Sequence, residues 1–146
     1  MYVKYNGALR GTLSSNSGDT IYSTTIHLIC SGLKQLSRVT LPPPGLLVYR
    51  GNGGMALPQD FLEPDERGSA GGVEIALMST SPDRAVALGY AGVEKGKDLP
   101  TLFEIEIGKT SIGADISPFS QFEAEKEFLY SPLRLVWGCS GVGNTI

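Results

Sequence analysis

Short apolar runs separated by glycine- and proline-rich connections limit the fold of this chain more than any other feature of its sequence. Runs of this length between turn residues predict strands, and they lie at residues 46–49, 73–78, 102–107, 127–130 and 133–137. An amphipathic helix is predicted over Thr24–Ser37, where apolar residues recur at helical spacing. A second helix is predicted after Ser81, with Ser81 as N-cap and Pro82 at the first helical position. Short strands that follow an N-terminal helix indicate an α+β domain and not a doubly wound sheet.

Two polar segments are predicted to be connections. Residues 6–20 are rich in Gly, Ser, Asn and Thr and predict a loop. Residues 52–72 are rich in glycine and predict a long connection with one helical turn around Pro58–Leu62. With 146 residues, the chain is expected to form one domain over residues 1–146.

Composition and charge exclude several classes of function. A formal net charge of −3 lacks the broad basic field of a nucleic-acid-binding protein, so no nucleic-acid partner is expected. No apolar run approaches the roughly 18 residues that span a membrane, and the N-terminus does not resemble a signal peptide, which favours a cytoplasmic location. Cys30, Cys139 and the single His27 make a zinc site improbable, and we expect no metal. Cys30 is expected to be a free thiol on the apolar side of its helix.

Two polar features lie where predicted strands end. Arg50-Gly51 follows the first strand, where an arginine can bind a phosphate and a glycine allows close approach of a ligand. Ser79-Thr80-Ser81 follows the second strand, where Ser79 can donate a hydrogen bond that holds a catalytic carboxylate. Each feature alone also fits an ordinary interpretation, a surface arginine and a strand-to-helix junction.

A third feature is the pair of acids in Glu125-Lys126-Glu127. If this segment continues the predicted strand, residues two apart point to the same face, so Glu125 and Glu127 lie side by side. Such a pair suits a general base beside an anion that stabilises a cation. Taken alone, the pair equally fits a solvated charged edge.

In this order, the three features resemble the arginine–serine–glutamate branch of the mono-ADP-ribosyltransferases. The resemblance rests on Tyr49-Arg50-Gly51 after an apolar strand, Ser79-Thr80-Ser81 before a helix, and Glu125-Lys126-Glu127 before a proline. It covers about residues 22–136 and implies a split β-sandwich around an NAD cleft. The histidine–tyrosine–glutamate branch does not fit, because arginine stands where that branch has histidine. The chain is short for the family, so a closing strand is expected to be missing.

The resemblance also implies a role for each matching residue. NAD, as co-substrate, would be bound by Arg50 at a phosphate, by the Gly51 backbone at the nicotinamide amide, and by a further set of residues, Ser79, Thr80, Ser81 and Glu127. Glu127 would stabilise the oxocarbenium-like transition state, with Ser79 positioning it. Glu125 would deprotonate the guanidinium of an arginine on an acceptor protein.

The resemblance assigns the remaining parts of the site more broadly. Phe119 and Phe122 would recognise the acceptor, Phe119 or Tyr90 would stack on nicotinamide, and residues 93–99 would cover the dinucleotide. The predicted activity is therefore NAD–protein-arginine ADP-ribosyltransferase. Two alternatives remain open: an NAD glycohydrolase that uses the same residues, and a catalytically silent NAD-binding or interaction domain. Preference for NAD or NADP and the oligomeric state also remain open.

Overall fold

The computed structural model describes residues 2–12, 22–54, 57–92, 101–108 and 113–137. The described helices are α1 (Tyr2–Leu9), α2 (Ser23–Val39), α3 (Gln59–Leu62) and α4 (Arg84–Ala91), with short 3-10 helices η2 (Ser117–Phe119) and η3 (Glu123–Glu125). The strands are β1 (Leu47–Asn52), β2 (Gly71–Glu74), β3 (Met78–Thr80), β4 (Thr101–Glu106), β5 (Ala114–Asp115), β6 (Phe128–Tyr130) and β7 (Arg134–Trp137). In this part of the chain, no helix is both long and apolar enough to cross a membrane.

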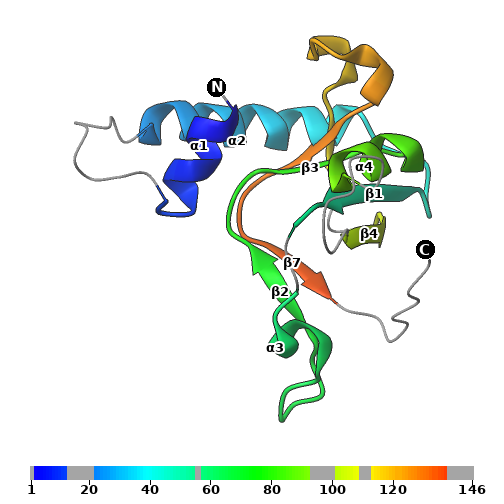
Figure 1. Cartoon of the computed structure of the whole chain (residues 1–146). Helices are drawn as coiled ribbons and strands as arrows, with labels where there is room; N and C mark the ends of the chain where they lie inside the picture. The colour runs from blue at the N-terminus through cyan, green and yellow to red at the C-terminus, as the bar shows by residue number, and fades with distance from the viewer. Residues whose placement is uncertain (1, 13–21, 55–56, 93–100, 109–112, 138–146) are drawn as a thin grey trace.

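The strands form small antiparallel sheets. β1 pairs with β4, β2 pairs with β7, and β6 lies between β3 and β5. Figure 1 shows the chain from β2 to β3 running beside the chain from β6 to β7, so the same two segments pair in two successive sheets. Two backbone hydrogen bonds between Tyr49 and Ser81, of 2.7 and 2.9 Å, connect β1 to the end of β3. The middle of β1 and the adjoining ends of β3 and β6 are therefore held close together.

Apolar residues of the three-stranded sheet pack into two clusters, one on each face. Met78 is paired with Tyr130, and both belong to a cluster with Val48 of β1. Leu129 is paired with Ala114, and both belong to a cluster with Leu33 of α2. Because neighbouring residues of a strand point to opposite faces, alternation along β6 assigns its residues to the two clusters. The sheet thus lies between α2 and β1.

The helix α2 forms as its apolar spacing predicts. Leu33 is buried, and Ile29 and Leu36 pack against the same cluster. The helix ends at Val39, after which Thr40 N–H donates to the carbonyl of Leu36. α2 therefore covers the three-stranded sheet and runs about one residue further at its start and two at its end than predicted (Figure 1).

The sequence does not predict helix α1, and the expected loop over residues 6–20 is wrong at its start, because α1 extends to Leu9. Asn6 and Gly7 have low helix propensity, so the local sequence does not favour a helix here. Tertiary contacts decide the outcome: the buried Asn6 donates to the carbonyl of Leu77 at 3.2 Å and accepts from its N–H at 3.1 Å. Residues 13–20 of the predicted loop lie outside the described residues.

The predicted strand 73–78 is wrong as a single element. β2 ends at Glu74 and pairs with β7, whereas β3 begins at Met78 and pairs with β6. Between them, the backbone N–H of Ala76 donates to the side chain of Glu74 at 3.0 Å instead of to a strand. Residues 73–78 form one apolar run because both β2 and β3 belong to sheets. Within that run, however, the pairing strand changes from β7 to β6.

Three predicted boundaries are also wrong for local backbone reasons. β6 begins at Phe128 and not at Glu127, because Lys126 adopts a left-handed conformation with φ of 47°. β7 begins after Leu133, whose φ is 62°. The N-cap of α4 is Asp83, whose side chain accepts from Ala85 N–H at 2.8 Å, and not Ser81.

Candidate active site

Ser79 and Glu127 are in direct contact. Their segments meet because β3 and β6 are paired, with Thr80 opposite Phe128. The Ser79 hydroxyl donates to Glu127 Oε1 at 2.5 Å, and both residues are half-buried. A hydrogen bond to a charged acceptor is short and strong, so it restricts the rotamer of the carboxylate. The structure thus brings together the serine and the glutamate that the sequence singled out.

Thr80 and Ser81 hold the backbone around Glu127. The Thr80 hydroxyl donates to the carbonyl of Phe128 at 3.1 Å, and the Ser81 hydroxyl donates to the carbonyl of Glu125 at 2.6 Å. Both residues are buried. Their hydroxyls therefore support the segment that carries the two acids, and the predicted contact of Thr80 and Ser81 with NAD stays a prediction.

Glu125 and Glu127 do not lie on one strand, so the prediction that they share a strand face is wrong. Glu125 ends η3, and the left-handed Lys126 turns the chain before Glu127. The two carboxylates have different partners: Ser79 donates to Glu127, whereas the Tyr90 hydroxyl donates to Glu125 Oε1 and Oε2 at 2.9 and 3.1 Å. Two acids close in sequence are thus oriented independently.

Arg50 lies inside β1 and is not a surface arginine. Its side chain is 15% exposed and ion-pairs with Glu74 at 3.1 Å. Its Nη1 donates to the carbonyl of Ser79 at 3.1 Å. Arg50, Ser79 and Glu127 are therefore linked in series through Ser79, and the three predicted segments meet at one place.

Glu74 is a residue of this region that the sequence analysis missed. It accepts from Arg50 and also from Arg10, whose Nη2 lies 3.0 and 2.9 Å from its two carboxylate oxygens. The signal that marks Glu74 is a single acid within an otherwise apolar predicted strand. Glu74 holds the guanidinium of Arg50 in place through an ion pair that is largely shielded from water. Its second arginine, Arg10, is more exposed.

Gly51 is needed for packing against α4. A Cβ at this position would lie 1.8 Å from the carbonyl oxygen of Ala87 and 2.7 Å from the backbone nitrogen of Ala91. We expect from the sequence that the missing side chain of Gly51 leaves space for a ligand. That expectation is corrected, because backbone atoms of α4 occupy the space. The predicted contact of the Gly51 backbone with nicotinamide is a separate matter and stays a prediction.

Exposed aromatic rings lie near the two acids in sequence or in space. Phe119 is 76% exposed on η2, and Phe122, at the start of η3, is 59% exposed. Tyr90 on α4 is 59% exposed and bonds to Glu125. Large exposed rings are common at sites that bind a partner, and their predicted roles in stacking and acceptor recognition stay predictions. The predicted covering segment, residues 93–99, lies outside the described residues.

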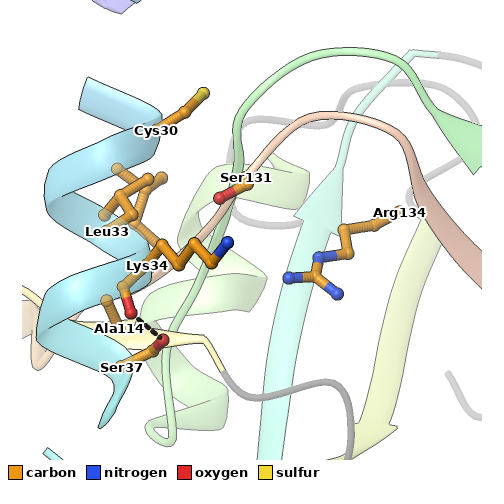
Figure 2. Close-up of a pocket in the computed structure, with 8 residues that line it drawn as sticks. Cys30, Leu33, Lys34, Ser37, Ala114, Ser131 and Arg134 are labelled. Atoms are coloured by element: carbon orange, nitrogen blue, oxygen red, sulfur yellow. Dashed lines mark hydrogen bonds between the residues drawn. The ribbon is translucent and has the colours of Figure 1, made fainter. Parts of the chain in front are cut away.

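A pocket of about 320 Å³ opens elsewhere, between α2 and the strands β5 and β6. Figure 2 shows Lys34 of α2 and Arg134 of β7 directed toward the space between these elements. Cys30, a partly buried free thiol whose pKa is raised by burial, also lines it. The residues that line this pocket include none of those predicted for the active site.

The family model described as NAD:arginine ADP-ribosyltransferase matches residues 1–138 of the chain. The chain belongs to this family. The match covers the three linked segments around Arg50, Ser79 and Glu127, and it confirms the resemblance drawn from their motifs. A search of the curated proteins found no match.

Solved ADP-ribosyltransferases have a similar fold. The Vis toxin from Vibrio splendidus, in its complex with the inhibitor M6, is 28% identical, with a TM-score of 0.65 over 90% of this chain and 57% of that one. HopU1 of Pseudomonas syringae pv. tomato DC3000 is 27% identical, with a TM-score of 0.61 over 92% of this chain and 56% of that one. The α+β ADP-ribosyltransferase-like fold is therefore confirmed. The chain spans a little over half the length of these relatives.

Proposed function

We propose that the chain transfers ADP-ribose from NAD to an arginine side chain of an acceptor protein and releases nicotinamide. The observation that carries this proposal is the 2.5 Å hydrogen bond from Ser79 to Glu127, with Glu125 held separately two residues away. One acid oriented toward the sugar and another oriented for the acceptor are what a transfer reaction needs. The Vis toxin, 26% identical in this comparison, has been solved in complex with agmatine, a small guanidinium compound.

The proposed reaction breaks the bond between C1′ of the nicotinamide ribose and the ring nitrogen of nicotinamide. The electron pair of that bond leaves with nicotinamide, and positive charge develops at C1′. Glu127 stabilises this charge and binds the ribose hydroxyl, while Ser79 keeps its carboxylate in place. A fixed anion at the position where charge develops is among the largest contributions to catalysis.

The acceptor then forms a new bond from a guanidinium nitrogen to C1′. Free arginine holds its proton tightly, so the nitrogen needs a base as it attacks. Glu125 takes that proton, which completes the exchange of nicotinamide for arginine. Arg50, fixed by Glu74 and the Ser79 carbonyl, binds a phosphate of NAD through its remaining N–H groups. Phe119 and Phe122 contact the acceptor.

We expect Glu127→Gln to lower both nicotinamide release and transfer to agmatine by about 10²–10³-fold, because the substitution removes the stabilising charge. Labelled NAD with and without agmatine measures both activities. Glu123→Gln is the matched control, since Glu123 is an exposed acid four residues before Glu127, on η3, and is not placed in the site. Nicotinamide release at the uncatalysed rate by both the wild type and Glu127→Gln would instead favour a silent NAD-binding domain.

We expect Glu125→Gln to abolish transfer to agmatine and to retain nicotinamide release, because glutamine cannot accept the proton of the guanidinium. The same labelled assay reports both products. Equal loss of both activities would contradict this division of labour. Nicotinamide release by the wild type without labelled agmatine or protein would identify an NAD glycohydrolase.

A further inference from the structure

Tyr90 is an exposed aromatic residue whose hydroxyl has a specific partner. It lies one residue before the end of α4, and 59% of its surface is exposed. Its hydroxyl is 2.9 Å from Glu125 Oε1 and 3.1 Å from Oε2, so it lies across the edge between the two oxygens. A large ring kept at the surface does not contribute to the core, and its hydrogen bond to an acid of the proposed site indicates a local role.

The backbone and the side chain of Glu125 are held by different elements. The Ser81 hydroxyl, at the end of β3, holds its carbonyl. Among the described residues, Tyr90 of α4 supplies the hydrogen bonds recorded for its carboxylate. Neither contact passes through Ser79 and Glu127, which are joined to each other. A change at Tyr90 therefore acts on Glu125 without removing the support of Glu127.

We propose that the Tyr90 hydroxyl is a positioning group for the acceptor step and sets how much ADP-ribose reaches a guanidinium instead of water. This inference rests on the proposed function. A glutamate has three rotatable side-chain bonds, and a half-buried one such as Glu125 still samples several rotamers unless a partner restricts it. The hydroxyl uses one edge of the carboxylate and leaves an outward lone pair on each oxygen. One such lone pair is sufficient to take the proton of the attacking nitrogen.

The geometry also limits how the acceptor binds. A guanidinium that binds a carboxylate with two parallel hydrogen bonds needs both oxygens along one edge. Tyr90 occupies that edge in this structure. The acceptor is therefore presented to a single oxygen of Glu125, which favours proton transfer from one nitrogen over a static bidentate ion pair.

The test is Tyr90→Phe, which removes the hydroxyl and keeps the ring. Transfer of label from NAD to agmatine and nicotinamide release without an acceptor are measured in parallel. We expect the ratio of transfer to release to fall about tenfold, since a hydrogen bond to a charged group is lost. Introduced into Glu125→Gln, the same change should not alter the ratio further, because the group on which Tyr90 acts is already lost.

Tyr22→Phe is the matched control. Its ring packs edge-on against Tyr5 with centroids 5.2 Å apart, a contact that phenylalanine preserves, and it lies outside the site. This variant should have the wild-type ratio of transfer to release. Thermal unfolding of both tyrosine variants checks that each remains folded.

Four other results would overturn the inference, and they differ in what they imply for the proposed function. An unchanged ratio in Tyr90→Phe overturns the inference and leaves the proposed function intact. Equal loss of transfer and release also overturns it, because Tyr90 would then act on NAD itself. A lower KM for agmatine with an undiminished rate of transfer overturns it as well, because the hydroxyl would then only obstruct the acceptor. A wild type that releases nicotinamide without modifying agmatine overturns both the inference and arginine transfer.

Discussion

Hydroxyl groups of three consecutive residues organise the acidic segment of the site. Ser79 holds the carboxylate of Glu127, while the next two residues, Thr80 and Ser81, hold the backbone on either side of Glu127. Neighbouring strand residues point to opposite faces, so the Thr80 hydroxyl points away from that of Ser79, and each of the three hydroxyls reaches a separate atom. The Ser79–Ser81 segment therefore serves the two acids by direct contact with their chain, in addition to any contact with a substrate.

Tyr130 gives a prediction that belongs to a single residue. It is 2% exposed, and burial raises its pKa from 10.0 to about 12, although the nearby charge of Arg134 acts in the opposite direction. The folded state then retains the proton at a pH where the unfolded state has lost it. The resulting stability is fully present below about pH 10 and is lost as the pH rises to about 12, by about 2 kcal/mol.

Denaturant unfolding between about pH 9 and pH 12 measures this loss. Tyr130→Phe has no phenol to ionise, so its unfolding free energy should decline less over the same range. Identical declines in the two proteins would show that the burial of Tyr130 does not contribute to the alkaline loss of stability.

At the scale of elements, the contact of β1 with α4 places the site. Gly51 lies directly against the backbone of the helix, and Ala87 and Ala91 on the facing side of the helix are buried. Small residues on both sides allow this close approach. The same helix carries Tyr90, so the packing of β1 on α4 also determines where the partner of Glu125 lies.

We expect Gly51→Ala to destabilise the protein by about 3 kcal/mol, the upper end of the usual cost of overpacking, because the added Cβ meets backbone atoms that cannot rotate away. The free energy of unfolding in urea measures the effect. Gly32→Ala on α2 is the control: its Cβ would meet nothing within 4 Å, and alanine in a helix should stabilise by roughly 0.5–1 kcal/mol. A Gly51→Ala protein as stable as the wild type would contradict the close packing.

The observed ends of the strands show that the local sequence pattern is insufficient to predict element boundaries. The apolar run 73–78 correctly predicts strand structure, but it contains two strands, β2 and β3, that pair with different partners. Likewise, alternation around Glu127 favours a strand, but the left-handed Lys126 places Glu125 in η3. Periodicity depends on neighbours along the chain, whereas the point at which a strand changes partner depends on the rest of the sheet.

At the scale of the whole molecule, contacts between distant segments unite small sheets that are not continuous with one another. The backbone bonds between Tyr49 and Ser81 connect two of them, and Glu74 of β2 joins Arg10, which follows α1, to Arg50 of β1. Two apolar clusters on opposite faces of the three-stranded sheet add further connections. The geometry of the site thus depends on the assembly as a whole, and not on one element.

The sequence by itself determined the α+β class and the helix α2, because apolar spacing is a local property of the chain. The order of its motifs also indicated Arg50, Ser79 and Glu127 as candidate site residues. Only the tertiary structure decided which groups face them. Tyr90 reaches Glu125 across 35 positions, and Glu74 reaches Arg50 across 24. Such partners are selected by strand pairing and helix packing, which bring side chains together irrespective of their separation in sequence, so no local pattern predicts which residues they contact.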